Sequence, residues 1–136
     1  MACPYFYPVE PFREDSQIRQ PRFPLGTAHR GICRAAGEPF EPGDDPLASF
    51  CNFGYGRGCC ARFPENAAYD AVRFSLVSHP GEMVQIVFVL ERDYSPVRYG
   101  KLECLDGTAQ GDEEDECIRR QAEVFAANYA PKMRCA

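Results

Sequence analysis

The stretch Ala71-Val-Arg-Phe-Ser-Leu-Val-Ser78, the turn His79-Pro-Gly-Glu82 and the stretch Met83-Val-Gln-Ile-Val-Phe-Val-Leu-Glu-Arg92 together decide the fold class. Apolar and polar residues alternate in the first stretch, which is typical of a strand with one buried face. The last stretch is β-branched and almost continuously apolar, which indicates a strand buried on both faces. Because a turn sequence rich in proline and glycine separates them, residues 71–92 are predicted to form a β-hairpin.

Two further elements follow the hairpin along the chain. A turn at residues 93–96 leads to a third predicted strand from Val97 to Leu105. From Cys117 to Ala130 apolar residues recur at helical spacing, which predicts a helix that Pro131 ends. The acidic run Gly111–Glu116 is expected to stabilise the start of this helix through the helix dipole, and a docking patch for a basic partner is the alternative.

The first 64 residues have a different character. They contain nine of the twelve prolines and ten of the seventeen aromatic residues, without helical or strand periodicity. Such a segment is predicted to be mostly loop with short helical turns, ordered by a bound metal centre. We therefore expect a single α+β domain over residues 1–136, in which a loop-rich metal-binding half (1–64) packs on a small antiparallel meander and a C-terminal helix (65–136).

The charge balance disfavours nucleic acid as a partner. The net charge is −5 at pH 7, and it comes entirely from residues 65–136, because residues 1–64 carry seven arginines against seven acidic residues. A chain with this balance repels phosphates unless a basic patch overrides it. No apolar run reaches the length of a membrane-spanning helix, and the first residues do not have the pattern of a secretory signal. We expect a cytoplasmic protein without membrane insertion.

The chain contains eight cysteines, and in the cytoplasm such patterns bind metal more often than they form disulfides. A secreted domain with four disulfides is the alternative. Cys3, Cys33, Cys51 and one of the adjacent pair Cys59 and Cys60 are widely spaced along the loop-rich half. Thiolates suit both iron–sulfur clusters and zinc, but structural zinc sites usually use closely spaced cysteine pairs that are absent here. We therefore predict a [4Fe-4S] cluster, with zinc as the alternative.

Three glycines, Gly54, Gly56 and Gly58, lie between the last two predicted ligands. Glycine permits positive φ, so this loop can curl round an anion and point amide N–H groups at it. An ordinary tight turn is the alternative, and the loop lacks the strand–loop–helix context of a nucleotide-binding fingerprint. Because neighbouring side chains diverge, only one of Cys59 and Cys60 is expected to ligate, and the residues alone leave this choice open.

Four short motifs stand out along the chain: Cys3–Phe6, Pro24–Gly26, Cys33-Arg34 and Cys51–Pro64. They resemble the pattern C-P-Y-F, P-L-G, C-R and C-N-x-G-Y-x-R-G-x-C-x-R-F-P of small uncharacterised bacterial proteins with four cysteines, which are expected to bind a [4Fe-4S] cluster. The resemblance extends loosely to the turn Glu91-Arg92-Asp93.

The resemblance also bears on the fourth ligand. In the bacterial pattern the invariant cysteine matches Cys60, whereas the position that matches Cys59 varies. The resemblance thus implies that Cys60 completes the set with Cys3, Cys33 and Cys51.

The remaining candidates receive structural interpretations. Cys104, Cys117 and Cys135 are expected to be small buried hydrophobes or an exposed tail thiol. His29 is at most a residue that supports a ligand, because a Rieske site needs two histidines paired with two cysteines.

These patterns favour a small redox protein that passes single electrons to a partner protein, with arginines such as Arg34, Arg57 and Arg62 tuning the reduction potential. An enzyme is disfavoured, since four cysteine ligands leave no open iron for a substrate. The alternatives are an interaction or scaffold module with a structural iron–sulfur or zinc site, and a sensor whose cluster is lost on oxidation.

Overall fold

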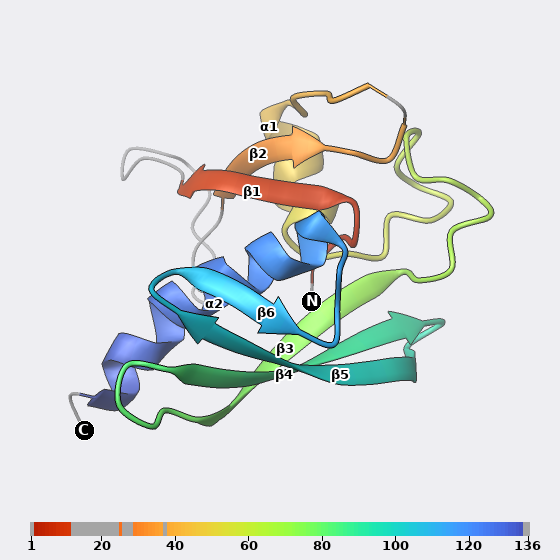
Figure 1. Cartoon of the computed structure of the whole chain (residues 1–136). Helices are drawn as coiled ribbons and strands as arrows, with labels where there is room; N and C mark the ends of the chain where they lie inside the picture. Colours follow the sequence, from red (N-terminus) through yellow and green to blue (C-terminus); the bar gives the residue numbers. More distant parts are fainter. Residues whose placement is uncertain (1, 12–24, 26–28, 37, 135–136) are drawn as a thin grey trace.

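The computed structural model describes residues 2–11, 25, 29–36 and 38–134. In chain order its elements are β1 (Phe6–Pro11), β2 (His29–Cys33), α1 (Asp44–Pro46), the π-helical turn η1 (Leu47–Cys51), β3 (Ala71–Ser78), β4 (Val84–Arg92), β5 (Ser95–Leu105), β6 (Thr108–Gly111) and α2 (Glu116–Arg134). Figure 1 shows α2 lying between the ribbon of β1 and β2 and the four-stranded sheet, and α2 contacts β1 and all four strands of that sheet. The predicted α+β class is confirmed.

The four-stranded sheet is an antiparallel meander in the order β3-β4-β5-β6. Strand β3 coincides with the predicted first strand, while β4 begins at Val84 instead of Met83 and β5 begins at Ser95 instead of Val97. Strand β6 was not predicted, because its four residues are too few to show a period.

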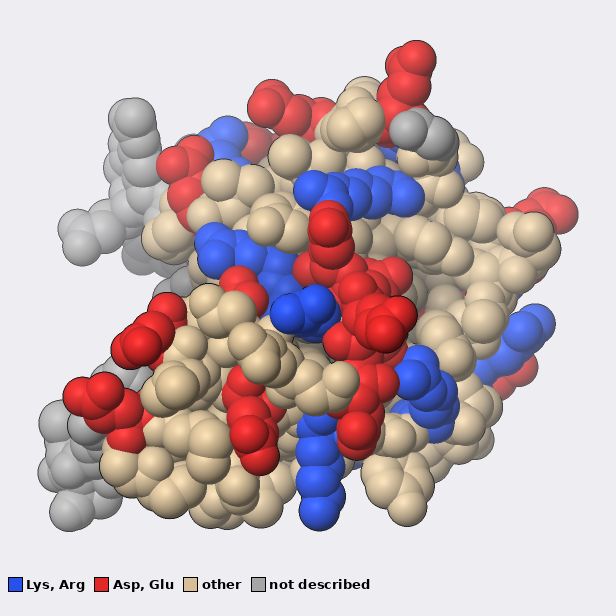
Figure 2. Space-filling view, in the orientation of Figure 1, with Lys and Arg blue, Asp and Glu red and all other residues tan. Residues whose placement is uncertain are grey.

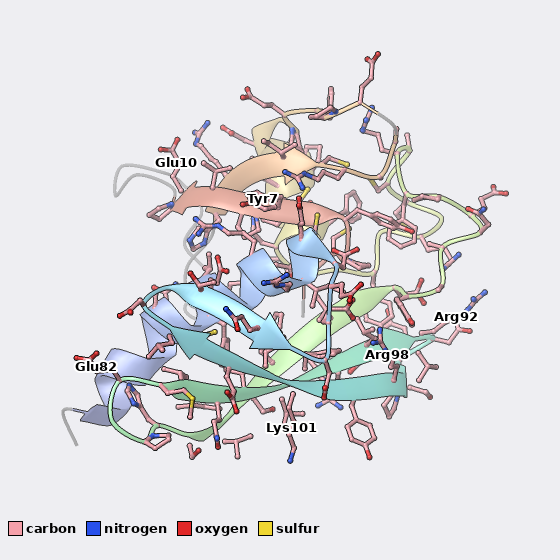
Figure 3. All side chains as sticks on the ribbon, viewed as in Figure 1. Tyr7, Glu10, Glu82, Arg92, Arg98 and Lys101 are labelled. Carbon is pink, nitrogen blue, oxygen red and sulfur yellow. The ribbon has the colours of Figure 1, made fainter. Side chains whose placement is uncertain are left out.

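The prediction that β4 is buried on both faces is wrong. Ile86, Phe88 and Leu90 are almost fully buried, but the residues between them are only half-buried. Helix α2 covers one face of the sheet, and Lys101 of β5 points away from α2 (Figure 3). Tyr99, also on β5, is 77% exposed. The run of valines in β4 therefore reflects β propensity on the outer face and burial on the inner one.

Helix α2 begins at Glu116 and is capped by Asp115, whose Oδ1 accepts hydrogen bonds from the amides of Cys117 and Ile118 at 2.8 and 3.2 Å. Within the acidic run, Asp115 caps the helix, while Asp112 and Glu113 bond to Lys101 and Arg98 of β5, and stabilisation through the helix dipole stays a prediction. Figure 2 shows acidic side chains gathered over this connection. The prediction that Pro131 ends the helix is wrong, since α2 continues to Arg134. A proline removes one intrahelical hydrogen bond, and this helix continues by about one turn beyond it.

The first half of the chain contains more regular structure than predicted. β1 and β2 form an antiparallel ribbon with a register shift between Pro8 and Glu10. Prolines are tolerated in edge strands and at bulges, where a missing N–H removes no ladder hydrogen bond, so Pro8 and Pro11 do not prevent the strand. Gly31 faces Pro8, and a Cβ at this position would overlap the carbonyl oxygen of Tyr7. The short helical turns that were predicted are α1 and η1.

Backbone and side-chain hydrogen bonds attach the first half to the sheet and the helix. Ala2 forms an antiparallel bridge with Val72 of β3, with N–O distances of 2.7 and 2.8 Å. Arg120 of α2 donates to the carbonyl oxygens of Pro8 and Val9 at 2.7 and 3.1 Å. In the part of the chain that the structure describes, no helix is long and apolar enough to cross a membrane.

Candidate metal centre

The four predicted ligands, Cys3, Cys33, Cys51 and Cys60, line one pocket. The other lining residues are mostly aromatic or small: Tyr5, Phe6, Ala35, Phe50, Gly56, Arg62 and Phe63. Cys33 and Cys51 are buried, and Cys3 and Cys60 are partly buried. The adjacent Cys59 is exposed and does not line the pocket. The fold thus brings together the four thiols that the sequence singled out, and their role as ligands stays a prediction.

Cys3 is fixed in place by the helix and by the segment that carries Cys51. Its amide donates to the carbonyl oxygen of Cys51 at 3.2 Å, and its own carbonyl closes a turn by accepting from the amide of Phe6 at 3.1 Å. Gln121 of α2 is fully buried, and its Nε2 donates to the carbonyl oxygens of Cys3 and Phe6, both at 2.7 Å. The C-P-Y-F turn is therefore anchored on α2 by one amide side chain.

Cys33 is the last residue of β2, opposite Phe6 of β1. Beyond the strand its backbone forms an isolated bridge with Phe40, with N–O distances of 2.7 and 3.1 Å. Backbone pairing with Phe6 on one side and Phe40 on the other thus fixes the position of Cys33. Cys33 and Phe6 both line the pocket.

Cys51 ends η1, a π-helical turn in which the amide of Asn52 donates to the carbonyl oxygen of Leu47 at 3.2 Å. Such wide turns occur frequently at functional sites. The side chain of Asn52 is 1% exposed, donates to the carbonyl oxygens of Leu47 and His29, and accepts from the amide of His29 at 2.9 Å. Asn52 thus ties the Cys51 turn to the start of β2, and the hydrogen bonds to Asn52 involve only the backbone of His29.

The glycines of the loop before Cys60 have two different roles, backbone conformation and close packing. Gly54 and Gly58 have φ angles of +80° and +82°, as predicted, whereas Gly56 does not have a positive φ. Space is tight at Gly56, because a Cβ there would lie 3.0 Å from the Cβ of Cys60 and would push that side chain aside. The amides of Cys59 and Cys60 donate to the carbonyl oxygen of Gly56 at 2.9 and 2.6 Å, so these two amides close a turn and do not serve a bound anion.

The three arginines singled out by the sequence have different environments. Arg57 donates to Asp70 at 2.6 Å and to the carbonyl oxygens of Glu65 and Ala67, which holds the loop on the sheet. Arg34 pairs with Glu116 at 2.6 Å. Only Arg62 of the three lines the pocket.

The burial of the thiols determines their protonation in the metal-free protein. Burial raises the pKa of Cys3 well above its usual range, and the neighbouring thiols raise it further. Burial also raises the pKa of Cys51 to about 12, again with a contribution from neighbouring thiols. Both groups are therefore neutral thiols near pH 7, and a metal that binds them must displace their protons.

Among the described residues, no three Cys, His, Asp or Glu side chains converge closely enough to hold one metal ion. Four thiolates on one zinc ion would have to lie about 3.8 Å apart, because the Zn–S bond is about 2.3 Å long. The cavity that they line is small, about 20 Å³, and it is partly open to solvent.

Sequence reasoning missed Asn52 and Gln121, which hold the segments of Cys51 and Cys3. The only available signal for Asn52 was its place in the C-N motif, and Gln121 had none. Cys104 and Cys117 are buried, as predicted for small hydrophobes, while Cys135 lies outside the described residues.

No protein-family model, curated protein or solved structure matches this chain.

Proposed function

We propose that this protein binds one [4Fe-4S] cluster through Cys3, Cys33, Cys51 and Cys60 and exchanges single electrons with a partner protein. The observation that carries the proposal is the convergence of four thiols, from four separate segments, on one pocket with apolar walls. The thiol of Cys59, one residue away from Cys60, lies outside it. Four thiolates complete the ligand set of a [4Fe-4S] cluster.

The preference for a cluster over a single zinc ion rests on the long spacings of the four cysteines along the chain, since structural zinc sites usually use closely spaced pairs. Each thiolate of a cubane binds a different iron, so the four sulfurs lie farther apart than around one zinc ion. Gly56 adds support, since the missing side chain leaves the backbone beside Cys60 close to the space that the cluster would fill.

Electron transfer is favoured over catalysis because four cysteine ligands leave no iron open to a substrate. The aromatic walls, which include Tyr5, Phe50 and Phe63, keep water from the centre, and burial of this kind is one means by which a protein sets a reduction potential. The proposal is consistent with a cytoplasmic protein, where thiols stay reduced until metal binds. We propose a protein as the electron partner.

Anaerobic purification followed by iron, sulfide and zinc analysis tests the proposal. We expect about four iron and about four sulfide per chain, with broad visible absorption and an EPR signal in one redox state. Stoichiometric zinc without visible absorption would refute it. A cluster that dithionite and mild oxidants leave unchanged would instead favour the alternative of a scaffold with a structural centre.

The pair Cys59 and Cys60 provides a matched control. Cys60→Ala should abolish iron binding, because Cys60 lines the pocket, and Cys59→Ala should leave iron and sulfide unchanged, because Cys59 is exposed. Both variants remove one thiol from the same turn, so they differ only in the direction of the lost side chain. Equal loss of iron from both would contradict the assignment of Cys60.

A further inference from the structure

Among the residues that the structure describes, Arg62 is the only Arg, Lys, Asp or Glu that lines the cysteine pocket. The carbon atom at the centre of its guanidinium lies 4.1 Å from the centroid of the Phe40 ring, a distance at which cation and ring attract each other. The same Phe40 forms the backbone bridge with Cys33. The guanidinium is thus positioned by a residue that is itself attached to one of the four thiol-bearing segments.

The Nε atom of Arg62 is buried and has no hydrogen-bond partner in the described structure. A buried donor without a partner is costly, and more so when it belongs to a charged group, so such groups in native proteins call for an explanation. The pocket walls offer little compensation, since they are almost entirely apolar apart from the thiols. An anionic acceptor in the pocket would satisfy the Nε–H group.

Arg34 and Arg57 do not have this property. Each donates to a carboxylate at 2.6 Å, Arg34 to Glu116 and Arg57 to Asp70, and neither lines the pocket. Of these three arginines, only Arg62 therefore has a buried donor without a partner and lines the candidate metal centre.

We propose that the Nε–H of Arg62 donates a charge-assisted hydrogen bond to a sulfur atom of the bound cluster and raises its reduction potential; this inference rests on the proposed function. Sulfide and thiolate sulfurs carry negative charge and accept hydrogen bonds. One electron delivered by a reduced partner protein adds one negative charge to the cluster. A cation that donates a hydrogen bond to sulfur stabilises that added charge, which makes reduction more favourable.

The test compares midpoint potentials of the anaerobically purified wild type with those of Arg62→Gln, Arg62→Lys and Arg34→Gln. Arg62→Gln should shift the potential to a lower value, and Arg62→Lys should shift it less, because lysine keeps the charge without the planar fork of donors. Arg34→Gln removes the same charge from a side chain outside the pocket, so we expect it to leave the potential close to that of the wild type. Equal potentials for Arg62→Gln and Arg34→Gln, with full iron content, would overturn the proposal.

A second measurement does not depend on a variant that holds its cluster. The wild type is labelled with ¹⁵N-arginine, reduced, and examined by pulsed EPR for a nitrogen coupling to the cluster. We expect a coupling in the wild type and in Arg34→Gln, and its absence in the wild type would overturn the role of Arg62. If the wild type contains no iron, the proposed function itself fails, and the two failures are thus distinguished.

Discussion

The pair of Arg57 and Asp70 offers a quantitative test of how the glycine-rich loop is held. The Nε of Arg57 lies 2.6 Å from Oδ1 of Asp70, and the two NH groups donate to the carbonyl oxygens of Glu65 and Ala67 at 2.6 and 2.7 Å. The second carboxylate oxygen of Asp70 accepts from the amide of Asp93 at 2.9 Å. The Asp70 side chain is 3% exposed, so its charge is almost wholly removed from water.

Arg57→Met removes the cation and leaves this buried carboxylate without its partner. Breaking a buried pair on one side costs about 3–5 kcal/mol of stability. The Arg57 side chain is 24% exposed and the Asp93 amide still reaches the carboxylate, so we expect the lower end, about 3 kcal/mol. Arg30→Met is the control: the pair of Arg30 and Asp44 is 3.7 Å apart with both side chains more than half exposed, which predicts a loss of about 0–1 kcal/mol.

The pair also predicts a pH dependence. Burial alone would raise the pKa of Asp70, but the hydrogen bond from the Asp93 amide and the Arg57 guanidinium together hold it below its usual value of 3.8. A carboxyl with a lowered pKa in the folded state contributes stability that is fully present above the unfolded pKa and is lost as the pH falls through the folded value. Asp70→Asn should therefore make the free energy of unfolding less dependent on pH below about 4.

Urea denaturation followed by far-UV circular dichroism measures these free energies, since the chain has no tryptophan for fluorescence. A double-mutant cycle with Arg57→Met and Asp70→Asn isolates the interaction between the two side chains. If Arg57→Met is no more destabilising than Arg30→Met, the loop is held by something else and the reasoning is refuted.

Three further predictions follow from the site. Gly56→Ala should lower the iron content measured by iron analysis, because the new Cβ would lie 3.0 Å from the Cβ of Cys60. Gly58→Ala is the control, since a Cβ there meets open space; its φ of +82° should cost about 1–2 kcal/mol of stability in urea denaturation, and the iron content should stay unchanged. Gln121→Met should destabilise the protein by about 1–2 kcal/mol and speed hydrogen exchange in β1, since two carbonyl oxygens lose a donor while an unpartnered Oε1 disappears as well. Removal of the metal should speed exchange in β1 and β2 and leave β4 and α2 protected, and uniform protection by mass spectrometry would count against this.

The hairpin of β3 and β4 could be predicted because its signal is local. Strand alternation and the proline-glycine turn lie within one contiguous stretch, so the two strands and their antiparallel pairing follow from them, although the register shift between Leu76 and Ser78 does not. The ribbon of β1 and β2 could not, since its prolines argue against strands and its partner segments are far apart in the sequence. What permits the ribbon is the close approach at Gly31, which is a tertiary property.

The same contrast applies to the candidate metal centre. Cysteine has a limited range of uses where thiols stay reduced, so Cys3, Cys33 and Cys51 could be singled out from residue type and spacing. The choice of Cys60 over Cys59 came from the resemblance to the bacterial pattern. Gln121 could not be singled out, because the residue whose carbonyl oxygen it binds, Cys3, lies 118 positions away in the sequence. A glutamine in a helix gives no sequence signal for such a contact. Asn52 likewise joins His29 across 23 residues. Candidate ligands can be recognised from their residue type, whereas the residues that hold them in place, such as Gln121 and Asn52, can be recognised only in the folded structure.

These positioning contacts bear on how metal binding and folding are coupled. The segment of Cys3 is anchored by Gln121 and that of Cys51 by Asn52, and neither anchor involves a metal. The loop of Cys60 is likewise held by Arg57 through Asp70. The pocket is therefore largely shaped by protein contacts, in contrast to zinc fingers, which are unfolded without metal. The cost of metal binding then lies in removing protons from buried thiols, and loss of the cluster should loosen the ribbon without unfolding the sheet beneath it.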